Sequence, residues 1–308
     1  MTEYDYTRQL ARAYGSGECS CYDACPIGEG LLVNIDGYSM EASLLPWMTQ
    51  ADWGWKATVA AVSDVLASGG RPLACMISLG LPNPTQAPVI VEAAGEACRF
   101  YDGRPGKGDF NAARRGGEWI DVAVVASTRR PVSRCNARPG DMVVQIGYAG
   151  YGLAARLLLD NIMAVDQVPR RVLDYTRRPT PPRQSWRITE GYATAAIDNS
   201  DGAGYSLALL ASQSKVTMRV DRIIPDPQVE ELLEEQGIGM EALAGSWEDY
   251  NIYATIPEDL VDEALKECKR LDVPCWIIGH TEEGAPGVYI GGKPYRGQGW
   301  NWTSTPPF

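Results

Sequence analysis

The sequence is poor in histidine and lacks paired zinc-binding cysteines. His280 is the only histidine among 308 residues, and it ends the apolar run Cys275 to Gly279, which suggests a structural residue at a strand end. This scarcity argues against Ser-His-Asp or Cys-His catalysis and against sites with several histidine ligands. None of the eight cysteines lies in a C-x-x-C pair, so a zinc ribbon is not indicated. Cys19, Cys21 and Cys25 cluster without a second cluster to complete a four-ligand set, which favours buried thiols or an occasional disulfide over a metal site.

Long hydrophobic runs and an excess of basic residues are also absent. No segment approaches the ~18 uninterrupted apolar residues of a membrane helix, and the polar start, Met1 to Leu10, does not resemble a signal peptide. We therefore expect a cytoplasmic protein with no membrane partner. Lys and Arg number 28 against 39 Asp and Glu, a net charge of −11 that repels nucleic acid. A small phosphorylated ligand remains compatible with this charge, because carboxylates can hold divalent cations.

The chain alternates short apolar runs with helical stretches, which predicts an α/β or α+β fold. Its length suits two domains, and the turn-rich segment 137–141 places their boundary between residues 136 and 137. The expected domains are thus residues 1–136 and 137–308. Strands are predicted at Leu31 to Ile35, Leu73 to Leu79, Ile120 to Ser127, Met142 to Ile146, Thr194 to Ile197, Val216 to Val220, Asn251 to Thr255 and Trp276 to Ile278. Helices are predicted at Trp53 to Ala67, Ala87 to Tyr101, Leu153 to Asn161, Ser206 to Gln213, Val229 to Gln236 and Glu258 to Lys269.

Several aspartates occupy positions suited to cation binding. Asp64 shares one face of the helix Trp53 to Ala67 with small apolar residues, so its carboxylate needs either a cation or backbone N–H donors. Asp36 and Asp198 directly follow apolar strands, where acids commonly line a ligand crevice, although each also suits a turn. Asp201 follows Asp198 by three residues, a spacing that suits cation binding, but residues 199–202 are also typical of a plain turn.

Two glycine-rich segments allow a phosphate or a structural interpretation. Gly106-Lys107-Gly108-Asp109 suits a loop that cradles phosphate while Asp109 meets a cation, or a plain surface loop. Gly147, Gly150 and Gly152 have G-x-x-G-x-G spacing instead of the dinucleotide pattern, which favours tight strand-to-helix packing over a cofactor site.

The order of these motifs along the chain resembles the thiamine-monophosphate kinases of the aminoimidazole-ribonucleotide-synthetase superfamily. Residues 51–56, leading to Val62-Ser63-Asp64, resemble the family segment that ends in a magnesium-binding Ser-Asp. Gly108-Asp109 falls where these kinases carry Gly-Asp-Thr, and residues 197–202 resemble their Asp-Ile-Ser-Asp-Gly. Glu248-Asp249-Tyr250 resembles their Gly-Glu-Asp-Tyr.

The resemblance implies a two-domain fold of that superfamily, with an N-terminal domain that forms a homodimer and the ATP site and a C-terminal α/β domain. It implies magnesium ligands at Asp23, Asp36, Asp64, Asp109, Asp198 and Asp201, of which Asp64, Asp109 and Asp201 would act in catalysis. It implies ATP contacts at Gly108, Asp109, Arg134 and Ser200, and substrate contacts at Glu41, Leu44, Glu248 and Trp300.

The sequence departs from the family pattern at two motifs. The family's early Gly-Asp-Asp-Ala-Ala is Cys21-Tyr22-Asp23-Ala24-Cys25, which retains only the second acid. Its Val-Glu-Gly-Val-His-Phe is Met40-Glu41-Ala42-Ser43-Leu44-Leu45, in which Leu44 replaces the substrate-side histidine. By this resemblance we expect that the metal ligands are mostly retained and that the substrate pocket is altered.

The expected function is an ATP- and Mg²⁺-dependent kinase that phosphorylates a small molecule, with thiamine phosphate as the candidate acceptor. A phosphate monoester acceptor is mostly dianionic near pH 7, so the reaction needs no protein base. An ATP-dependent synthetase resembling aminoimidazole-ribonucleotide or selenophosphate synthetase is an alternative. A non-catalytic nucleotide-binding relative is another, since a shared fold does not guarantee a shared reaction.

Overall fold

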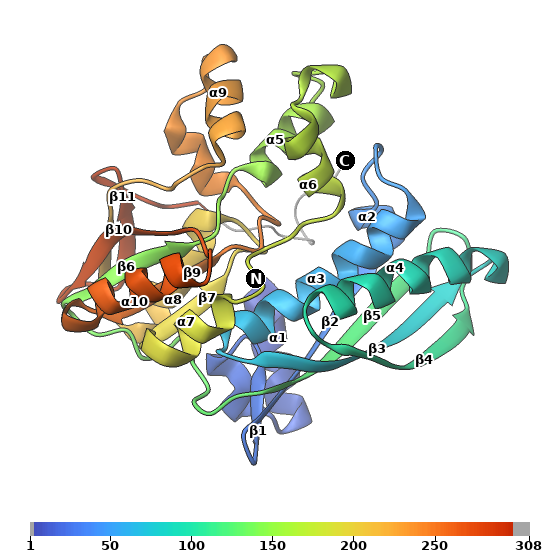
Figure 1. Cartoon of the computed structure of the whole chain (residues 1–308), viewed down its shortest axis with the longest axis horizontal. Helices are drawn as coiled ribbons and strands as arrows, with labels where there is room; N and C mark the ends of the chain where they lie inside the picture. The colour runs from blue at the N-terminus through green and yellow to red at the C-terminus, as the bar shows by residue number, and fades with distance from the viewer. Residues whose placement is uncertain (1–2, 298–308) are drawn as a thin grey trace.

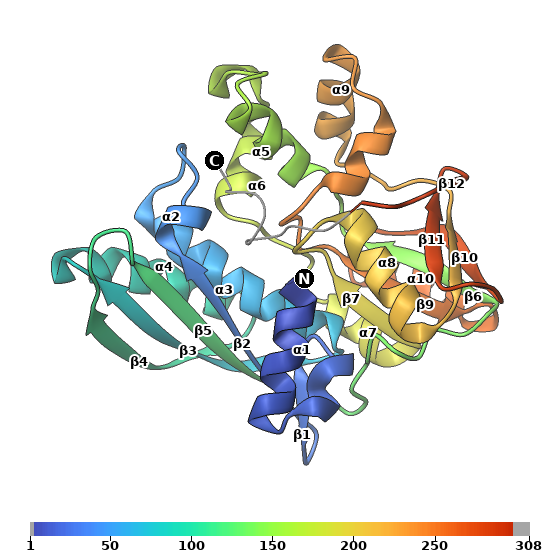
Figure 2. The ribbon, with the colours of Figure 1, turned by 180° about the vertical axis from the view of Figure 1, so that it is seen from behind.

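The computed structural model describes residues 3–297, and each half of this span builds one mixed sheet (Figures 1 and 2). The first sheet has the strand order β1-β2-β5-β3-β4. All of its pairs are antiparallel except β3 with β4. Its strands are β1 (Cys25–Gly28), β2 (Leu31–Ser39), β3 (Arg71–Leu81), β4 (Arg104–Ala112) and β5 (Trp119–Ser127).

Helices α3 (Gln50–Ala67) and α4 (Ala87–Phe100) cover one face of this sheet (Figure 1). A capping box between Thr49 and Asp52 fixes the start of α3. The small residues of α3 allow it to pack on several sides, so that nearly the whole helix is buried. The remaining elements of this half are α1 (Glu3–Tyr14), η1 (Gly17–Cys21), α2 (Met40–Ser43) and η2 (Pro84–Gln86).

The second sheet has the strand order β12-β11-β8-β10-β6-β9-β7, and only β8 with β11 is parallel. Its strands are β6 (Asp141–Ile146), β7 (Ala195–Asp198), β8 (Thr217–Val220), β9 (Ile252–Pro257), β10 (Cys275–Glu282), β11 (Gly287–Ile290) and β12 (Lys293–Pro294). Its helical elements are α5 (Tyr151–Leu159), η3 (Val165–Gln167), α6 (Arg170–Arg177), α7 (Ser185–Tyr192), α8 (Ala203–Ser214), α9 (Pro227–Glu235), η4 (Met240–Gly245) and α10 (Glu258–Arg270). Among residues 3–297, no helix combines the length and apolar character needed to cross a membrane.

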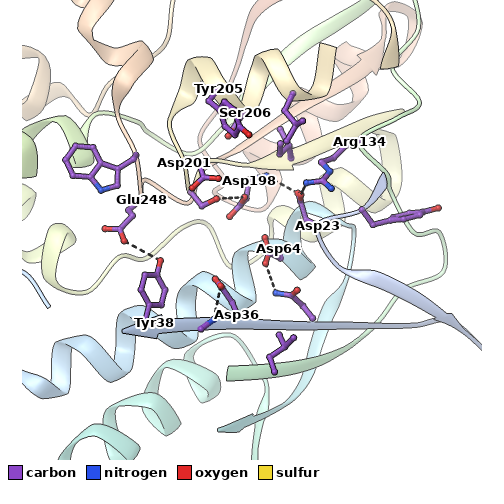
Figure 3. A pocket seen from close by; sticks show the side chains of 18 of the residues that line it. Asp23, Asp36, Tyr38, Asp64, Arg134, Asp198, Asp201, Tyr205, Ser206 and Glu248 are labelled. Carbon is purple, nitrogen blue, oxygen red and sulfur yellow. Dashed lines mark hydrogen bonds and ion pairs between the residues drawn. The ribbon is translucent and has the colours of Figure 1, made fainter. Parts of the chain in front are cut away.

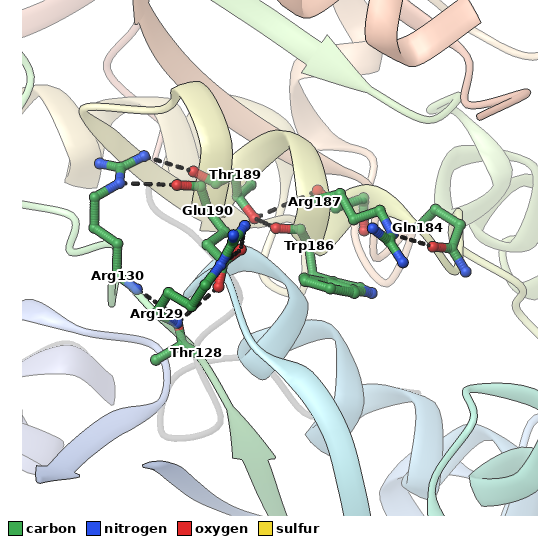
Figure 4. A network of polar contacts seen from close by, with 9 residues as sticks. Thr128, Arg129, Arg130, Gln184, Trp186, Arg187, Thr189 and Glu190 are labelled. Atoms are coloured by element: carbon green, nitrogen blue, oxygen red, sulfur yellow. Dashed lines mark hydrogen bonds and ion pairs between the residues drawn. The ribbon is translucent and has the colours of Figure 1, made fainter. Parts of the chain in front are cut away.

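The two halves are joined by α3 and by two arginines that follow β5. Helix α3 contacts β2 and β5 in the first half, and α7, β7 and β9 in the second. The Arg130 guanidinium donates to the main-chain oxygens of Thr189, Glu190 and Ala193, which caps the C-terminus of α7 (Figure 4). Arg129 Nη2 lies 2.6 Å from the Glu190 carboxylate. These contacts fix the orientation of the two sheets across the site described below.

The structure corrects the loop predicted at residues 106–109 and contains helices that the sequence did not predict. Residues 106–109 are not a glycine loop but part of β4, which pairs in parallel with β3. A Cβ on Gly106 would lie 3.1 Å from the main-chain oxygen of Cys75, so glycine permits this close strand pairing. Helices α6 and α7 were not predicted from the sequence. Disulfides join Cys19 to Cys25, Cys21 to Cys135 and Cys268 to Cys275, while Cys75 and Cys98 are buried free thiols.

Candidate functional site

Acidic side chains from both halves of the chain converge on one cavity of about 340 Å³ (Figure 3). Asp23 comes from the segment between η1 and β1, Asp64 from α3, and Asp198 from the end of β7. One carboxylate oxygen of each lies within 4.8 Å of the others, which is close enough for a shared cation. The other acids that line the cavity are Asp36, Asp201 and Glu248.

Neighbouring polar groups orient this aspartate trio, Asp23, Asp64 and Asp198. Asn34 Nδ2 donates to Asp64 Oδ2 at 2.5 Å, and Ser63 Oγ donates to Asp198 Oδ2 at 2.6 Å. The Asp198 main-chain N–H donates to Asp23 Oδ2 at 3.2 Å. Each carboxylate is therefore held in place by the fold before any ligand binds.

Burial and mutual repulsion make the ionised form of the aspartate trio unfavourable. Loss of hydration, followed by the charge of Asp23, raises the pKa of Asp198 to about 8. Burial and the neighbouring aspartates likewise raise the pKa of Asp64 well above its usual value. Arg134 Nη1, 3.0 Å from Asp23 Oδ1, offsets only part of this negative charge. A divalent cation would relieve the repulsion, and three convergent carboxylates are the oxygen ligands that Mg²⁺ prefers.

Most of the residues assigned from the sequence to metal and ATP line this cavity. Asp36, Arg134, Ser200 and Asp201 lie around the aspartate trio. Ser200 Oγ donates to Asp198 Oδ1 at 3.4 Å, a long hydrogen bond that leaves the hydroxyl near the cavity. Acids that are distant in sequence therefore line a single cavity.

The end of the cavity opposite Arg134 is aromatic and contains a buried ion pair. Tyr38 Oη donates to Glu248 Oε1 at 3.3 Å, and Lys56 Nζ lies 2.5 Å from Glu248 Oε2. Lys56 is only 1% exposed, and besides Glu248 its ammonium contacts the Ser43 main-chain oxygen, to which it donates at 3.3 Å. Trp247 and Tyr205 also line the cavity. The sequence assignments do not include Asn34, Tyr38 and Trp247, which line the cavity, or Lys56, which pairs with Glu248. Lys56 carried a signal, because it belongs to the segment 51–56 that resembles the kinases.

Four assigned residues lie elsewhere. Gly108 and Asp109 belong to β4, whose residues are all exposed, and neither lines the cavity. On α2 and just after it, Ala42 and Leu45 line the cavity, whereas Glu41 is exposed and Leu44 packs against the core. The assignments of these four residues stay predictions. Trp300 lies outside the described residues.

The glycines of the G-x-x-G-x-G segment serve packing. A Cβ on Gly152 would overlap the main-chain oxygen of Trp247, and Gly150 has a φ of 102° that favours glycine. The main-chain N–H groups of Gly150 and Gly152 both donate to the buried Asp249 carboxylate at 2.9 Å. The start of α5 is thus occupied by a protein carboxylate, which supports the packing interpretation over a dinucleotide site.

Comparison with known proteins identifies the family. The model described as "AIR synthase related protein, N-terminal domain" matches residues 17–128, and "AIR synthase related protein, C-terminal domain" matches residues 138–291. A thiamine-monophosphate kinase of Pyrococcus horikoshii is 30% identical over 265 residues, which cover 84% of this chain and 81% of the relative. That of Aquifex aeolicus is 30% identical over 80% of this chain and 79% of its own.

Solved structures agree with the sequence matches. The structure described as "AaThiL complexed with AMPPCP and TMP" has a TM-score of 0.85 and 26% identity, covering 98% of this chain and 97% of its own. Thiamine monophosphate kinase from Aquifex aeolicus has a TM-score of 0.80 and 26% identity, covering 94% and 97%. The two-domain fold inferred from the sequence is confirmed. The protein therefore belongs to the AIR-synthase-related family and, within it, to the thiamine-monophosphate kinases, which are ATP-dependent phosphotransferases.

Proposed function

We propose that this protein transfers the γ-phosphoryl group of ATP, in the presence of Mg²⁺, to thiamine monophosphate and releases ADP and thiamine diphosphate. The observation that carries the proposal is the convergence of Asp23, Asp64 and Asp198 within one cavity. The match to a structure described as binding AMPPCP and TMP supports both the nucleotide and the acceptor.

The aspartate trio fits magnesium by the chemistry of its donors. It offers carboxylate oxygens within 4.8 Å of one another, with hydrogen bonds that already fix their orientation. Asp36 and Asp201 add two further carboxylates around the same cavity. When bound, Mg²⁺ would supply neutralisation of the triphosphate charge, the principal requirement of phosphoryl transfer.

The remaining groups of the cavity align two anions without a general base. A phosphate monoester has a second pKa of about 6, so its dianion is itself the nucleophile near pH 7. Arg134 reaches the cavity beside Asp23 and would offset charge on the transferred group. No histidine lines the cavity, which is consistent with this mechanism.

The aromatic end of the cavity suits the acceptor. Thiamine carries a positively charged thiazolium ring, and rings such as Trp247 and Tyr38 attract cations through their electron-rich faces. Glu248 adds a carboxylate at the same end, with its second oxygen paired to Lys56. We assign Tyr38, Trp247 and Glu248 to acceptor binding, with the acceptor phosphate directed toward the aspartate trio.

We further propose that two copies of the chain form a homodimer through the first sheet. Figure 2 shows the face opposite α3 and α4 open over β3 and β5. By strand register Ile35 and Leu73 belong to this face, and they are 69% and 40% exposed. Exposed apolar residues on an open sheet favour association with a second sheet. Ile35 also lines the cavity, so a partner on this face would lie next to the site. Light scattering should report twice the mass of one chain, and Leu73→Asp should shift it toward the monomer.

Product analysis tests the proposed reaction. The purified protein, incubated with ATP, Mg²⁺ and thiamine monophosphate, should release ADP and thiamine diphosphate in equal amounts. Asp64→Asn and Asp201→Asn should abolish turnover with an unchanged circular dichroism spectrum, whereas Asp160→Asn, an exposed acid paired with Arg156, should not. Inorganic phosphate as the product would indicate a synthetase, and nucleotide binding without turnover would indicate a non-catalytic relative.

A further inference from the structure

Two disulfides bracket the segment that carries Asp23. Cys19 pairs with Cys25 across six residues, and Cys21 pairs with Cys135 across 114 residues. Asp23 lies two residues from both Cys21 and Cys25. Arg134, which forms an ion pair with Asp23, directly precedes Cys135. The covalent links therefore adjoin both members of the ion pair.

Hydrogen bonds run parallel to the Cys21–Cys135 link. The Arg134 main-chain N–H donates to the Cys21 oxygen at 2.7 Å, and Arg134 Nη2 donates to the Ser20 oxygen at 2.9 Å. The Arg134 guanidinium then reaches Asp23 at 3.0 Å. Movement of residue 135 away from residue 21 would strain all three contacts, since the same short segment makes them.

The segment 22–24 has little regular structure of its own to hold Asp23 in place. It lies between η1 and β1, and Ala24 N donates to Ser68 Oγ at 2.9 Å. Asp23 lies within 4.8 Å of two other carboxyl groups, and in their ionised, cation-binding forms the mutual repulsion favours displacement of Asp23 from the cavity. A covalent constraint opposes that displacement. In this chain, cysteines occupy the first and last positions of the motif that is Gly-Asp-Asp-Ala-Ala in the family.

We propose that Cys21 and Cys135 are positioning residues: their disulfide holds Asp23 and Arg134 against Asp64 and Asp198, so that its loss weakens the binding of Mg²⁺ and nucleotide. The inference rests on the proposed function. It predicts that the disulfide acts through Asp23 on affinity, beyond any contribution to stability.

The first test compares matched disulfide variants. Isothermal calorimetry measures the Kd for Mg²⁺ with AMPPCP at 25 °C, in oxidised wild type, in Cys21→Ser/Cys135→Ser and in Cys268→Ser/Cys275→Ser. The last variant removes the disulfide between α10 and β10, whose residues do not line the cavity. We expect a roughly tenfold higher Kd for the first variant, equivalent to about 1.4 kcal/mol, and an unchanged Kd for the second. Equal Kd values in all three proteins would overturn the inference.

A reduction experiment provides a second test in case the Cys21→Ser/Cys135→Ser variant does not fold. Dithiothreitol supplies two electrons and two protons to each disulfide and is itself oxidised to a cyclic disulfide. In the Cys268→Ser/Cys275→Ser background, reduction followed by alkylation should raise the Kd by a similar factor while circular dichroism is unchanged. A Kd that does not change on complete reduction contradicts the proposal.

A double-mutant cycle separates positioning from general stabilisation. In an Asp23→Asn background, removal of the Cys21–Cys135 disulfide should cause a much smaller further loss of affinity than in wild type, because Asp23 is one of the two groups it positions. Fully additive losses would show that the disulfide acts elsewhere. One zinc ion per chain, bound by Cys19, Cys21, Cys25 and Cys135 as free thiols, would also overturn the inference, because the Cys21–Cys135 disulfide would then not exist. Metal analysis and mass spectrometry would detect it. Absence of any nucleotide binding by the oxidised wild type would instead refute the proposed function.

Discussion

At the scale of single residues, the site depends on charges that the fold brings together. Asp64 and Asp198 could be singled out from the sequence because one shares an apolar helix face and the other ends an apolar strand, where a carboxylate needs a partner. Asn34 could not, because an asparagine inside a predicted strand region gives no sign of the acid it will meet. Its partner, Asp64, is 30 residues away and is fixed only by the packing of α3 on β2.

The Lys56–Glu248 ion pair leads to a prediction about both stability and substrate binding. Lys56→Met removes a buried cation and leaves Glu248, 18% exposed at its side chain, without its charge partner. We expect a loss of about 3 kcal/mol in the free energy of unfolding, measured in urea. We also expect a higher KM for thiamine monophosphate with an unchanged KM for ATP.

The matched control for Lys56 is the double variant Lys56→Met/Glu248→Gln. Neutralising the stranded acid should recover part of the lost stability, although not the acceptor affinity, because Glu248 is assigned to the acceptor. A loss below about 1 kcal/mol in Lys56→Met would contradict the idea that this pair is buried and coupled.

At the scale of elements, predictability followed the strength of the local pattern. The helix expected at Trp53 to Ala67 lies within α3, and the strand expected at Met142 to Ile146 lies within β6. Strand β4 was missed because glycine and charged residues disfavour strands locally, and its pairing with β3 overrides that preference. Helix α7 was missed because it is short and gains its stability from Arg130 and from α3.

Asp249, which lies just before β9 and contacts the start of α5, should make the stability of the fold depend on pH. Burial raises the pKa of Asp249 from 3.8 to about 6, despite hydrogen bonds from Gly150 and Gly152 that oppose the rise. Between these two values the unfolded chain has lost the proton that the folded chain keeps. The contribution of Asp249 to the free energy of unfolding therefore falls by roughly 3 kcal/mol as the pH rises from about 4 to 6, and is constant above.

Urea unfolding of wild type and Asp249→Asn between pH 4 and 7 measures this contribution. The variant lacks the titrating group. The free energy of unfolding of wild type minus that of the variant should therefore be highest at pH 4 and should decrease toward pH 6. A difference that is independent of pH would show that the Asp249 carboxyl has the same pKa in the folded and unfolded chains.

At the scale of the whole molecule, one chain does not gather every residue that the family resemblance assigns to the site. Asp109 lies on the exposed edge strand β4, while the aspartate trio lies in a cavity that no residue of β4 lines. A single sequence can match Asp109 to a motif, but it does not show which cavity Asp109 adjoins. If two chains pair through the first sheet, the edge strand of one can approach the cavity of the other.

Subunit mixing tests whether Asp109 acts across such an interface. Asp64→Asn and Asp109→Asn homodimers should each be inactive, because every site lacks one acid. Mixed after reversible dissociation, they should regain about a quarter of wild-type activity, since half of the dimers are then hybrids and each hybrid contains one site with both acids intact. Mixtures that stay inactive despite subunit exchange, shown by mass spectrometry, would place Asp109 outside the partner's site. If the Asp109→Asn homodimer keeps full activity on its own, the family assignment does not transfer to this position.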